Sequence, residues 1–374
     1  MRGKTMDMGG PLLLVNGSFV GRRVTGTQRY AIEMTRSLLA QGVPLRVLLL
    51  KDTPRPDWLP EAACEWLPSL GQARLARFIV NGLIAPLWVA GKYRGRDYVV
   101  WSPCNVGSPL FPNHVVTIHD MTIRAGPEWF ARAFVGFYRV CFMAFSVQRV
   151  GVITDSVFSA KEIAKYYPPL ARDTVVIRCG VDPVKAQTIS RPAGLAGDVP
   201  FVLSVASKDP RKNLGWILES WRKRKAAYPS RLVLVGGGSE VFRRMNDGAS
   251  DGGGSDMVDL GYVSDAELAW LYRHCHAVVM ASLYEGFGLP ATEALVQGAR
   301  VICSDIPPFR EAAGDAARYF KLGDRAGFLA AVDEVFALGR FTGEAPRLST
   351  WAEVAKLFAD HLTKRGRVRA GRVI

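Results

Sequence analysis

Continuous apolar runs alternate with helical patterns along most of the chain, and this alternation constrains the fold more than any other feature. The segments PLLLVNG, TQRYAIEMTRSLLAQG and PLRVLLL predict a strand, a helix that ends at Gly42 and a second strand. Further strands are predicted in DYVVWSP, HVVTIHD and VGVITDS. Uninterrupted apolar strands between helices are typical of parallel sheets that helices cover on both faces.

The alternation stops at residues 184–200, which are rich in proline, glycine and small residues, and then starts again. A second sheet is predicted from FVLSVAS, RLVLVGGG, MVDLGYV, AVVMAS and RVICSD, with a helix over Asn213–Ala226. A length of 374 residues also suits two domains. We therefore predict two α/β domains, over residues 1–184 and 185–349, with ligands in a cleft at the carboxyl ends of the strands. The C-terminal helix, 350–374, is expected to pack back on the first domain.

Basic residues outnumber acidic ones by 48 to 34, which gives a formal net charge of +14. Up to Lys185 there are 23 basic and 13 acidic residues, so the first half alone carries +10. Such a field attracts phosphates, nucleic acid or an anionic membrane surface. A second basic cluster lies in the C-terminal tail (Lys364, Arg365, Arg367, Arg369 and Arg372).

We expect neither a signal peptide nor a transmembrane span. The apolar run near the N-terminus is too short for a signal peptide, and the longest apolar stretch, FVGFYRVCFMAFSV, contains Arg139. The six cysteines form no C-x-x-C pair, which argues against a zinc ribbon or a disulfide framework and fits a reducing compartment. The sequence therefore predicts a cytoplasmic protein.

The strongest local signal for a ligand site is the segment SLYEGFGLPATEALVQG. Glu285 comes before a glycine-rich turn, Pro290 is expected at the first helical position, and Glu293 is expected in the first turn of that helix. A helix N-terminus carries unpaired N–H groups and a partial positive charge, so the backbone here can hold a diphosphate. Glu293 alone also fits simple stabilisation of the helix dipole, but that interpretation does not explain Glu285.

The pattern Glu-x7-Glu in EGFGLPATEAL, followed by GARVICSD, resembles family 4 of the retaining, nucleotide-sugar-dependent glycosyltransferases, in a mannosyltransferase-like form. Other segments stand in the order of that family: GTQRYAIEM, IHDM, TDSVFSAKEI, RCGVD, SVASKDPRKNL, LVGGG and LGYVSDAELAWLY. The resemblance covers most of the chain. It implies the GT-B fold, in which two Rossmann-like parallel-sheet domains face a central cleft.

The resemblance also implies roles for residues of the second domain. Glu293 would hold the nucleotide ribose, and Glu285 would bind hydroxyls of the transferred sugar. Arg211 and Lys212 would lie on the donor diphosphate and stabilise the charge that develops as the sugar–phosphate bond breaks. The alternative is a solvated basic turn after Pro210. The backbone close to sugar and phosphate would be that of Gly286, Phe287, Gly288 and Leu289.

In the first domain, the resemblance implies a phosphate contact at Gly26 and Thr27, although an ordinary turn into a helix explains them equally well. His119, which ends the predicted strand VVTIH, would contact the donor sugar near the reacting centre. The alternative is an ordinary hydrogen-bonding histidine. Asp120 is interpreted as a turn former. Asn105 and Ser156 could either contact the acceptor or stabilise loops, and the sequence does not decide between these roles. Many relatives carry an arginine where this chain has Ala206, and Lys208 is a doubtful substitute.

The sequence contains none of the common metal-binding motifs, although the donor diphosphate needs a source of positive charge. The sequence holds no D-x-D, no H-x-x-H and no cysteine cluster, whereas a diphosphate leaving group needs positive charge. Arg211, Lys212 and a helix N-terminus can supply that charge, so we expect metal-independent catalysis with no cofactor beyond the nucleotide-sugar substrate. GDP-mannose is the favoured donor by resemblance. Retention implies attack on the face that the nucleotide leaves; double displacement through Glu285 ranks lower.

The segment QARLARFIVNGLIAPLWVAGKYRGR mixes five cations with a broad apolar surface. It fits either an interfacial segment on an anionic leaflet or a buried helix with basic ends. Together with the charge of the first half, it predicts peripheral attachment to the inner face of the cell membrane and a lipid-linked saccharide acceptor.

Three other functions compete with this interpretation. A dinucleotide-dependent oxidoreductase needs G-x-G-x-x-G, but the nearest candidate, Gly236–Gly238, has Val241 where the last glycine belongs. A nucleic-acid-binding protein would explain the charge but not the spacing of Glu285 and Glu293, so no nucleic-acid partner is expected. A catalytically inactive sugar-binding homologue remains an alternative, although the charged donor-site positions are mostly present.

Overall fold

The computed structural model describes residues 10–374 except 72, 185–188, 196, 206–208, 226–228, 237–255, 342 and 371–374, and gives no side-chain description of 74 and 365–370. Several sequence predictions lie outside the described residues. These are Ala206 and Lys208, the glycine candidate beyond Gly236, and the side chains of the basic tail from Arg365 onward.

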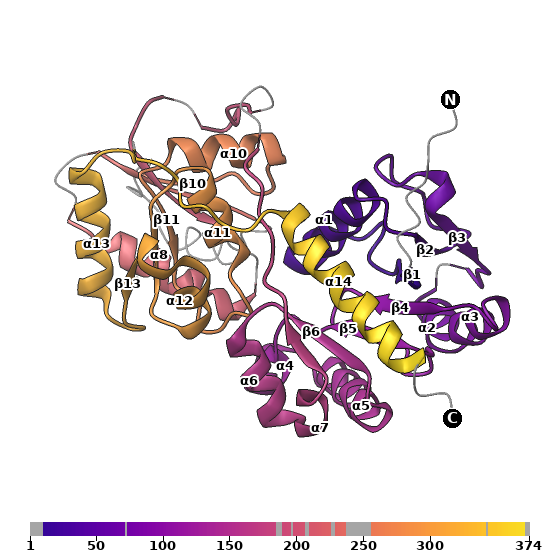
Figure 1. The fold of residues 1–374 in the computed structure, drawn as a ribbon. Helices are drawn as coiled ribbons and strands as arrows, with labels where there is room; N and C mark the ends of the chain where they lie inside the picture. Colours follow the sequence, from indigo (N-terminus) through magenta and orange to yellow (C-terminus); the bar gives the residue numbers. More distant parts are fainter. Residues whose placement is uncertain are drawn as a thin grey trace, which may run out of the picture. The chain divides into compact units, whose positions relative to one another are not determined.

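The chain divides into two compact units: unit 1 is residues 1–180 with 349–374, and unit 2 is residues 181–348 (Figure 1). Each unit is an α/β domain built on one parallel sheet, which confirms the predicted fold class. The strands of unit 1 lie in the order β3-β2-β1-β4-β5-β6-β7. They are β1 (Leu12–Asn16), β2 (Leu45–Leu50), β3 (Cys64–Leu67), β4 (Tyr98–Ser102), β5 (His114–Thr117), β6 (Gly151–Thr154) and β7 (Thr174–Val176).

Helices connect most successive strands of unit 1, whereas β2 leads to β3 through a 3-10 turn and β4 leads to β5 through residues 103–113, which contain no helix. The helices are α1 (Gly26–Ala40), α2 (Arg74–Ile79), α3 (Ala85–Lys92), α4 (Thr122–Ala125), α5 (Arg132–Gln148), α6 (Val157–Tyr166) and α7 (Pro168–Ala171), with a π-helical turn at Val80–Ile84 and short 3-10 turns at Glu61–Ala63 and Pro127–Trp129. The last helix of the chain, α14 (Trp351–Ala370), contacts α1 and β4. It begins with a capping box, because Thr350 Oγ1 accepts from Glu353 N and Thr350 N donates to Glu353 Oε2.

Unit 2 has six parallel strands in the order β10-β9-β8-β11-β12-β13. They are β8 (Phe201–Val205), β9 (Arg231–Val235), β10 (Met257–Asp259), β11 (Ala277–Met280), β12 (Val301–Ser304) and β13 (Ala317–Phe320). The helices are α8 (Leu214–Arg222), α10 (Asp265–His274), α11 (Leu289–Val296), α12 (Pro307–Ala313) and α13 (Arg325–Ala337), with 3-10 turns η5 (Pro210–Lys212) and η6 (Gly314–Ala316). The helix predicted over Asn213–Ala226 is therefore shorter, and ends at Arg222.

The strand orders determine where ligands can bind. In unit 1 the order reverses between β1 and β4, and in unit 2 it reverses between β8 and β11. Loops leave such neighbouring strands in opposite directions at their carboxyl ends, which opens a crevice there. The segments after β8 and β11 contain the motifs that the sequence singled out in unit 2. The central strands are almost fully buried, so they provide a rigid base for these loops.

One described helical stretch, Leu75–Lys92, is long and apolar enough by length and composition to cross a membrane, whereas we expected no such segment. Its inner residues Val80, Ala85 and Val89 are buried in the core of unit 1, in a cluster that includes Leu14. These residues pack the stretch on the sheet as a covering layer, although only 22% of the stretch is buried.

Candidate active site

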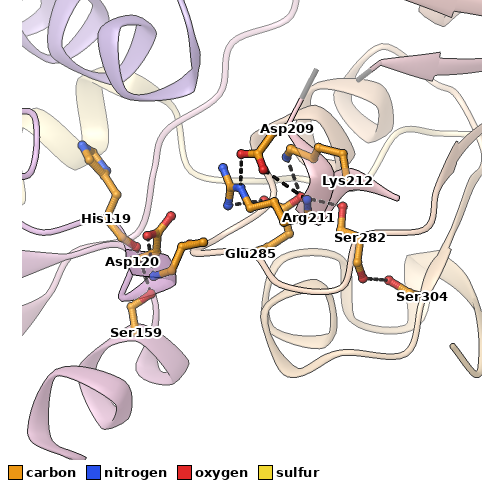
Figure 2. A network of polar contacts seen from close by, with 10 residues as sticks. His119, Asp120, Ser159, Asp209, Arg211, Lys212, Ser282, Glu285 and Ser304 are labelled. Atoms are coloured by element: carbon orange, nitrogen blue, oxygen red, sulfur yellow. Dashed lines mark hydrogen bonds and ion pairs between the residues drawn. The ribbon is translucent and has the colours of Figure 1, made fainter. Parts of the chain in front are cut away.

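In unit 2, four charged side chains gather where β8 and β11 end (Figure 2). Asp209 caps the turn η5 by accepting from Arg211 N at 3.1 Å, and it also pairs with Arg211 Nε at 2.6 Å. Asn213 then adopts a left-handed conformation with φ of 55°, which lets the chain turn from η5 into α8. This local geometry directs Arg211 and Lys212 toward the loop that follows β11.

Glu285 is the centre of this cluster and is only 4% exposed. Lys212 Nζ donates to its Oε1 at 2.5 Å, Ser282 Oγ donates to the same oxygen at 2.7 Å, and Arg211 lies 3.5 Å from Oε2. The backbone joins the two segments as well, since Leu283 N donates to Arg211 O at 2.7 Å. The structure thus brings together the predicted residues Glu285, Arg211 and Lys212.

The electrostatics keep the Glu285 carboxylate ionised. Burial alone would raise its pKa, but the charges of Lys212 and Arg211 and the hydrogen bonds from Lys212 and Ser282 hold the pKa below its usual value. The formal charges of two carboxylates and two cations cancel within the cluster. Glu285 therefore positions the two cations, whose side chains stay 16–19% exposed at the edge of the crevice.

Gly288 sets the conformation that starts α11. Its φ of +102° lies in the region that favours glycine, and a Cβ there would lie 2.8 Å from the ring of Phe309, which is fully buried. The N-terminus of α11 thus lies directly after the Glu285 loop, as the sequence predicted. Two details differ from expectation: Pro290 is the second helical residue, and the first turn holds no acidic residue.

Glu293 therefore lies beyond the first turn of α11, where dipole stabilisation explains it less well. Its Oε2 accepts a hydrogen bond from the hydroxyl of Tyr272 at 3.2 Å. Tyr272 belongs to α10, whose helix starts at a capping box formed by Ser264 and Glu267. The buried tyrosine holds the half-buried carboxylate in place on the exposed side of the helix.

The unit 1 candidate His119 lies just after β5 and is 6% exposed. Its Nδ1 is 2.5 Å from Asp155 Oδ2 and its Nε2 is 2.8 Å from Pro103 O. Burial lowers the pKa of the imidazole, but Asp155, the Pro103 carbonyl and Asp120 raise it, and the net direction is upward. Both ring nitrogens therefore face acceptor atoms of the protein, and these contacts fix the orientation of the ring. The contact of His119 with the donor sugar stays a prediction.

The backbone of His119 is fixed by two more residues. Asn105 Oδ1 accepts from His119 N at 2.7 Å. Ser159 Oγ donates to His119 O at 2.9 Å (Figure 2). Of the residues that the sequence left open, Asn105 thus stabilises a loop and Ser156 caps α6. Asp120 accepts from Thr122 N at 2.9 Å, which confirms its interpretation as a turn former.

Gly26 and Thr27 start α1, after a capping box between Thr25 and Gln28. A Cβ on Gly26 would meet nothing within 4 Å, and its φ is not in the left-handed region. Neither packing nor backbone strain therefore requires glycine there. The exposed position leaves the backbone open to close approach by a ligand.

Several residues of the site were not singled out from the sequence: Asp209, Ser282, Ser304 and Tyr272 in unit 2, with Asp155 and Ser159 in unit 1. Asp209 before Pro210 is a helix-capping signal that could have been used. Ser304 donates to Ser282 O at 2.6 Å from the end of the adjacent strand β12, a contact that requires the strand order. Within the described residues, no three His, Cys, Asp or Glu side chains are grouped so that they could hold a metal ion.

Comparison with known proteins connects this geometry to an enzyme family. Residues 185–339, which contain the whole Glu285 cluster, match the family "Glycosyl transferases group 1". The chain is a glycosyltransferase. This glycosyltransferase is 26% identical to the O-antigen chain mannosyltransferase B of Escherichia coli over 281 residues, which cover 72% of this chain and 70% of that one. It is 27% identical to the O-antigen chain mannosyltransferase RfbU of Salmonella typhimurium, over 64% of this chain and 66% of the relative.

Solved structures show that the glycosyltransferase has the GT-B fold. Anabaena HepE in complex with UDP-glucose has a TM-score of 0.65 at 16% identity, covering 97% of this chain and 99% of that one. WaaG, a glycosyltransferase involved in lipopolysaccharide biosynthesis, has a TM-score of 0.64 at 15% identity, covering 96% and 98%. The sucrose-phosphate synthase of Thermosynechococcus elongatus has a TM-score of 0.63 at 18% identity, covering 97% and 98%.

The ion pair of His119 makes the stability of unit 1 depend on pH. Because the folded-state pKa is raised, the pair contributes fully below the unfolded pKa of about 6.5 and is lost as pH rises through the folded value. We expect His119→Gln to lower the melting temperature by about 5 °C near pH 6, since a charged hydrogen bond contributes roughly 1.5–3 kcal/mol. Thermal melts by circular dichroism from pH 5.5 to 9 would measure this. A deficit that grows with pH would contradict the assignment, and Asp155→Asn should show the same trend as His119→Gln.

Proposed function

We propose that this glycosyltransferase transfers a hexose, with mannose favoured, from a nucleotide sugar to a lipid-linked or oligosaccharide acceptor in surface-polysaccharide synthesis. The observation that carries the proposal is the buried Glu285, held by Lys212 and Arg211 beside the N-terminus of α11. This arrangement offers a carboxylate for sugar hydroxyls and cations for a diphosphate within one crevice. The names of the two O-antigen relatives support mannose, and GDP-mannose is therefore the favoured donor.

For the reaction itself, we propose retention of configuration through attack on the face that the nucleotide leaves. A donor phosphate oxygen would take the proton of the acceptor hydroxyl as the sugar–phosphate bond breaks. Double displacement would require Glu285 as nucleophile. Its Oε1 already accepts from Lys212 and Ser282, and Oε2 lies 3.5 Å from Arg211; these contacts lower the nucleophilicity of a carboxylate. The contacts of Glu285 therefore favour the same-face mechanism.

We also propose that the positive charge on the leaving diphosphate comes from the protein. Arg211 and Lys212 provide two cations, and the backbone N–H groups of Gly288 and Leu289 provide donors at the start of α11. In unit 1, the exposed backbone at Gly26 and Thr27 is the proposed second phosphate contact. Transfer is accordingly expected to continue at full rate in EDTA.

The proposed ribose contact makes a specific prediction for nucleotide binding. Glu293→Ala is expected to weaken binding of the nucleoside diphosphate by about 10–100-fold, because a hydrogen bond to a charged group contributes roughly 1.5–3 kcal/mol. Isothermal titration calorimetry would measure the dissociation constant. Tyr272→Phe is the matched control: it removes the hydroxyl that positions Glu293 but keeps the carboxylate, so its effect should be several-fold smaller. Unchanged binding by Glu293→Ala would exclude this ribose contact.

A thermal-shift panel with GDP, UDP, dTDP and ADP, each with and without EDTA, tests the donor class. A ligand that binds only the folded state raises the melting temperature, and the stabilisation grows with the logarithm of its concentration over Kd. We expect GDP to give the largest shift and EDTA to leave that shift unchanged. A larger shift with UDP would indicate a UDP-sugar as the donor instead of GDP-mannose. If none of the four nucleotides shifts the melting temperature, the proposed function is wrong.

We further propose that the enzyme works in the cytoplasm as a peripheral protein on the inner face of the cell membrane. A lipid-linked acceptor resides at that surface, and the +10 charge of the N-terminal half suits anionic headgroups.

A further inference from the structure

The outer side of the segment 74–92 in unit 1 is apolar. Five large side chains of α2, the π-helical turn and α3 are exposed: Leu75, Phe78, Ile79, Leu83 and Leu87. Leu75 is 69% exposed and Leu87 is 64% exposed. Their spacing of about four residues places them along one stripe, opposite the side chains that pack on the sheet.

Helix α5 has a second exposed apolar stripe. Phe134, Phe137, Val140, Met143 and Val147 are exposed on this helix, and Val147 reaches 82%. Its opposite face is buried in a core cluster of unit 1, so the helix is bound to the domain on one side and unpartnered on the other.

The two stripes meet. The rings of Phe78 and Phe137 contact each other edge to face with centroids 5.8 Å apart. Together the stripes hold ten of the 20 large hydrophobic side chains that are exposed in the described part of the chain. Apolar side chains gathered this densely mark an interaction surface, whereas single exposed ones need no explanation. We call these two stripes the apolar face of unit 1.

The positive charge around the apolar face favours an anionic partner. Residues 65–97 and 128–155 contain eight basic and four acidic residues, a net charge of +4. Lys92 pairs with Glu65 and Arg77 lies 3.9 Å from Asp52. Exposed cations stand on α5 itself and just after α3, among them Arg94, Arg132 and Arg139. A second copy of the chain would bring like charges together across this face, whereas anionic headgroups would complement them.

We propose that the apolar face of unit 1 docks on an anionic lipid bilayer, with the stripes of α2–α3 and α5 in the interfacial layer and the arginines at the headgroups. The inference deepens the proposed function and rests on it in one respect: docking would bring the enzyme to a lipid-linked acceptor. The segment does not cross the bilayer, because Val80, Ala85 and Val89 are required in the core.

Vesicle flotation of the full-length protein tests the proposal. Phosphatidylcholine vesicles with about one-third phosphatidylglycerol should carry the wild type at low salt, and pure phosphatidylcholine vesicles should carry much less. Val140→Glu/Val147→Glu should reduce binding to the anionic vesicles by about tenfold or more, since two charges enter the apolar layer. Leu357→Glu is the matched control, because Leu357 is 60% exposed on α14 and lies outside the face; it should float like the wild type.

Three outcomes would overturn the proposal. One is no flotation of the wild type, and another is an equal loss with Leu357→Glu. The third is a wild-type dimer in light scattering that becomes a monomer in the double variant without any change in vesicle binding, which would assign the face to a second copy.

An assay of sugar transfer to a detergent-solubilised acceptor distinguishes a failure of membrane docking from a failure of the proposed function. If the double variant keeps transfer but does not float, the function stands and the docking is confirmed. If the wild type floats but transfers no sugar, the proposed function fails alone.

Discussion

Replacing Lys212 with alanine is expected to lower kcat for sugar transfer by about 10²–10³-fold, which is the usual loss when one preorganised donor to a developing negative charge is removed. Lys212 Nζ is held 2.5 Å from Glu285 Oε1, so its position is fixed before the diphosphate arrives. The charge on the leaving phosphate is greatest in the transition state, and for that reason KM for the donor should change less than kcat. Initial-rate kinetics with the donor identified by thermal shift would measure both constants.

The same substitution also leaves the buried Glu285 with one cation fewer, so a loss of activity could reflect a loss of stability. Removing one partner of a buried ion pair typically costs about 3–5 kcal/mol. The double variant Lys212→Ala/Glu285→Gln removes the unpaired charge and should recover much of the melting temperature without recovering kcat. Lys356→Ala, an exposed lysine on α14, serves as the control for mutation of any lysine. If kcat of Lys212→Ala stays within threefold of wild type, Lys212 has no role on the diphosphate.

The fold was predictable because its central strands are continuous apolar runs. Each of the ten strands expected from the sequence is present, and all pair in parallel. Three strands were not predicted: β3, β7 and β13. Each is three or four residues long and lies at an edge of its sheet, where partial exposure weakens the apolar pattern. Residues 75–92 were hard to interpret for another reason. Because this stretch is apolar on both faces, the sequence does not indicate which face packs on the sheet.

The candidate site was predictable to the extent that its residues are close in sequence. Arg211, Lys212 and Glu285 were recognised from two short motifs, and the structure joins them. Tyr272 and Ser304 were missed because their contacts depend on which elements are neighbours in space. For His119 the sequence indicated a residue at a strand end, but not that Asp155, from a segment 36 residues later, would occupy its Nδ1.

Gly288→Ala is expected to destabilise unit 2 by about 2–5 kcal/mol, which combines about 1–2 kcal/mol for a left-handed residue with a Cβ and about 1–3 kcal/mol for overpacking. The added Cβ would stand 2.8 Å from the ring of Phe309, which is fully buried among the helices and strands of the core and cannot move aside cheaply. Thermal melts should show a fall of roughly 5–15 °C. Nucleotide binding should weaken as well, because Gly288 caps α11 and sets the direction of its first N–H groups.

Gly298→Ala separates the two causes, since Gly298 at the end of α11 also has a positive φ, +82°, but a Cβ there would meet nothing within 4 Å. It should therefore lose only the backbone contribution, about 1–2 kcal/mol, and keep its nucleotide affinity. Equal losses for the two variants would mean that Phe309 yields to the new methyl group. In that case the close packing of Phe309 against Gly288 would not be what holds the start of α11 beside Glu285. A larger loss for Gly288→Ala, reduced when Phe309→Leu is added, would show that this packing holds the crevice in shape.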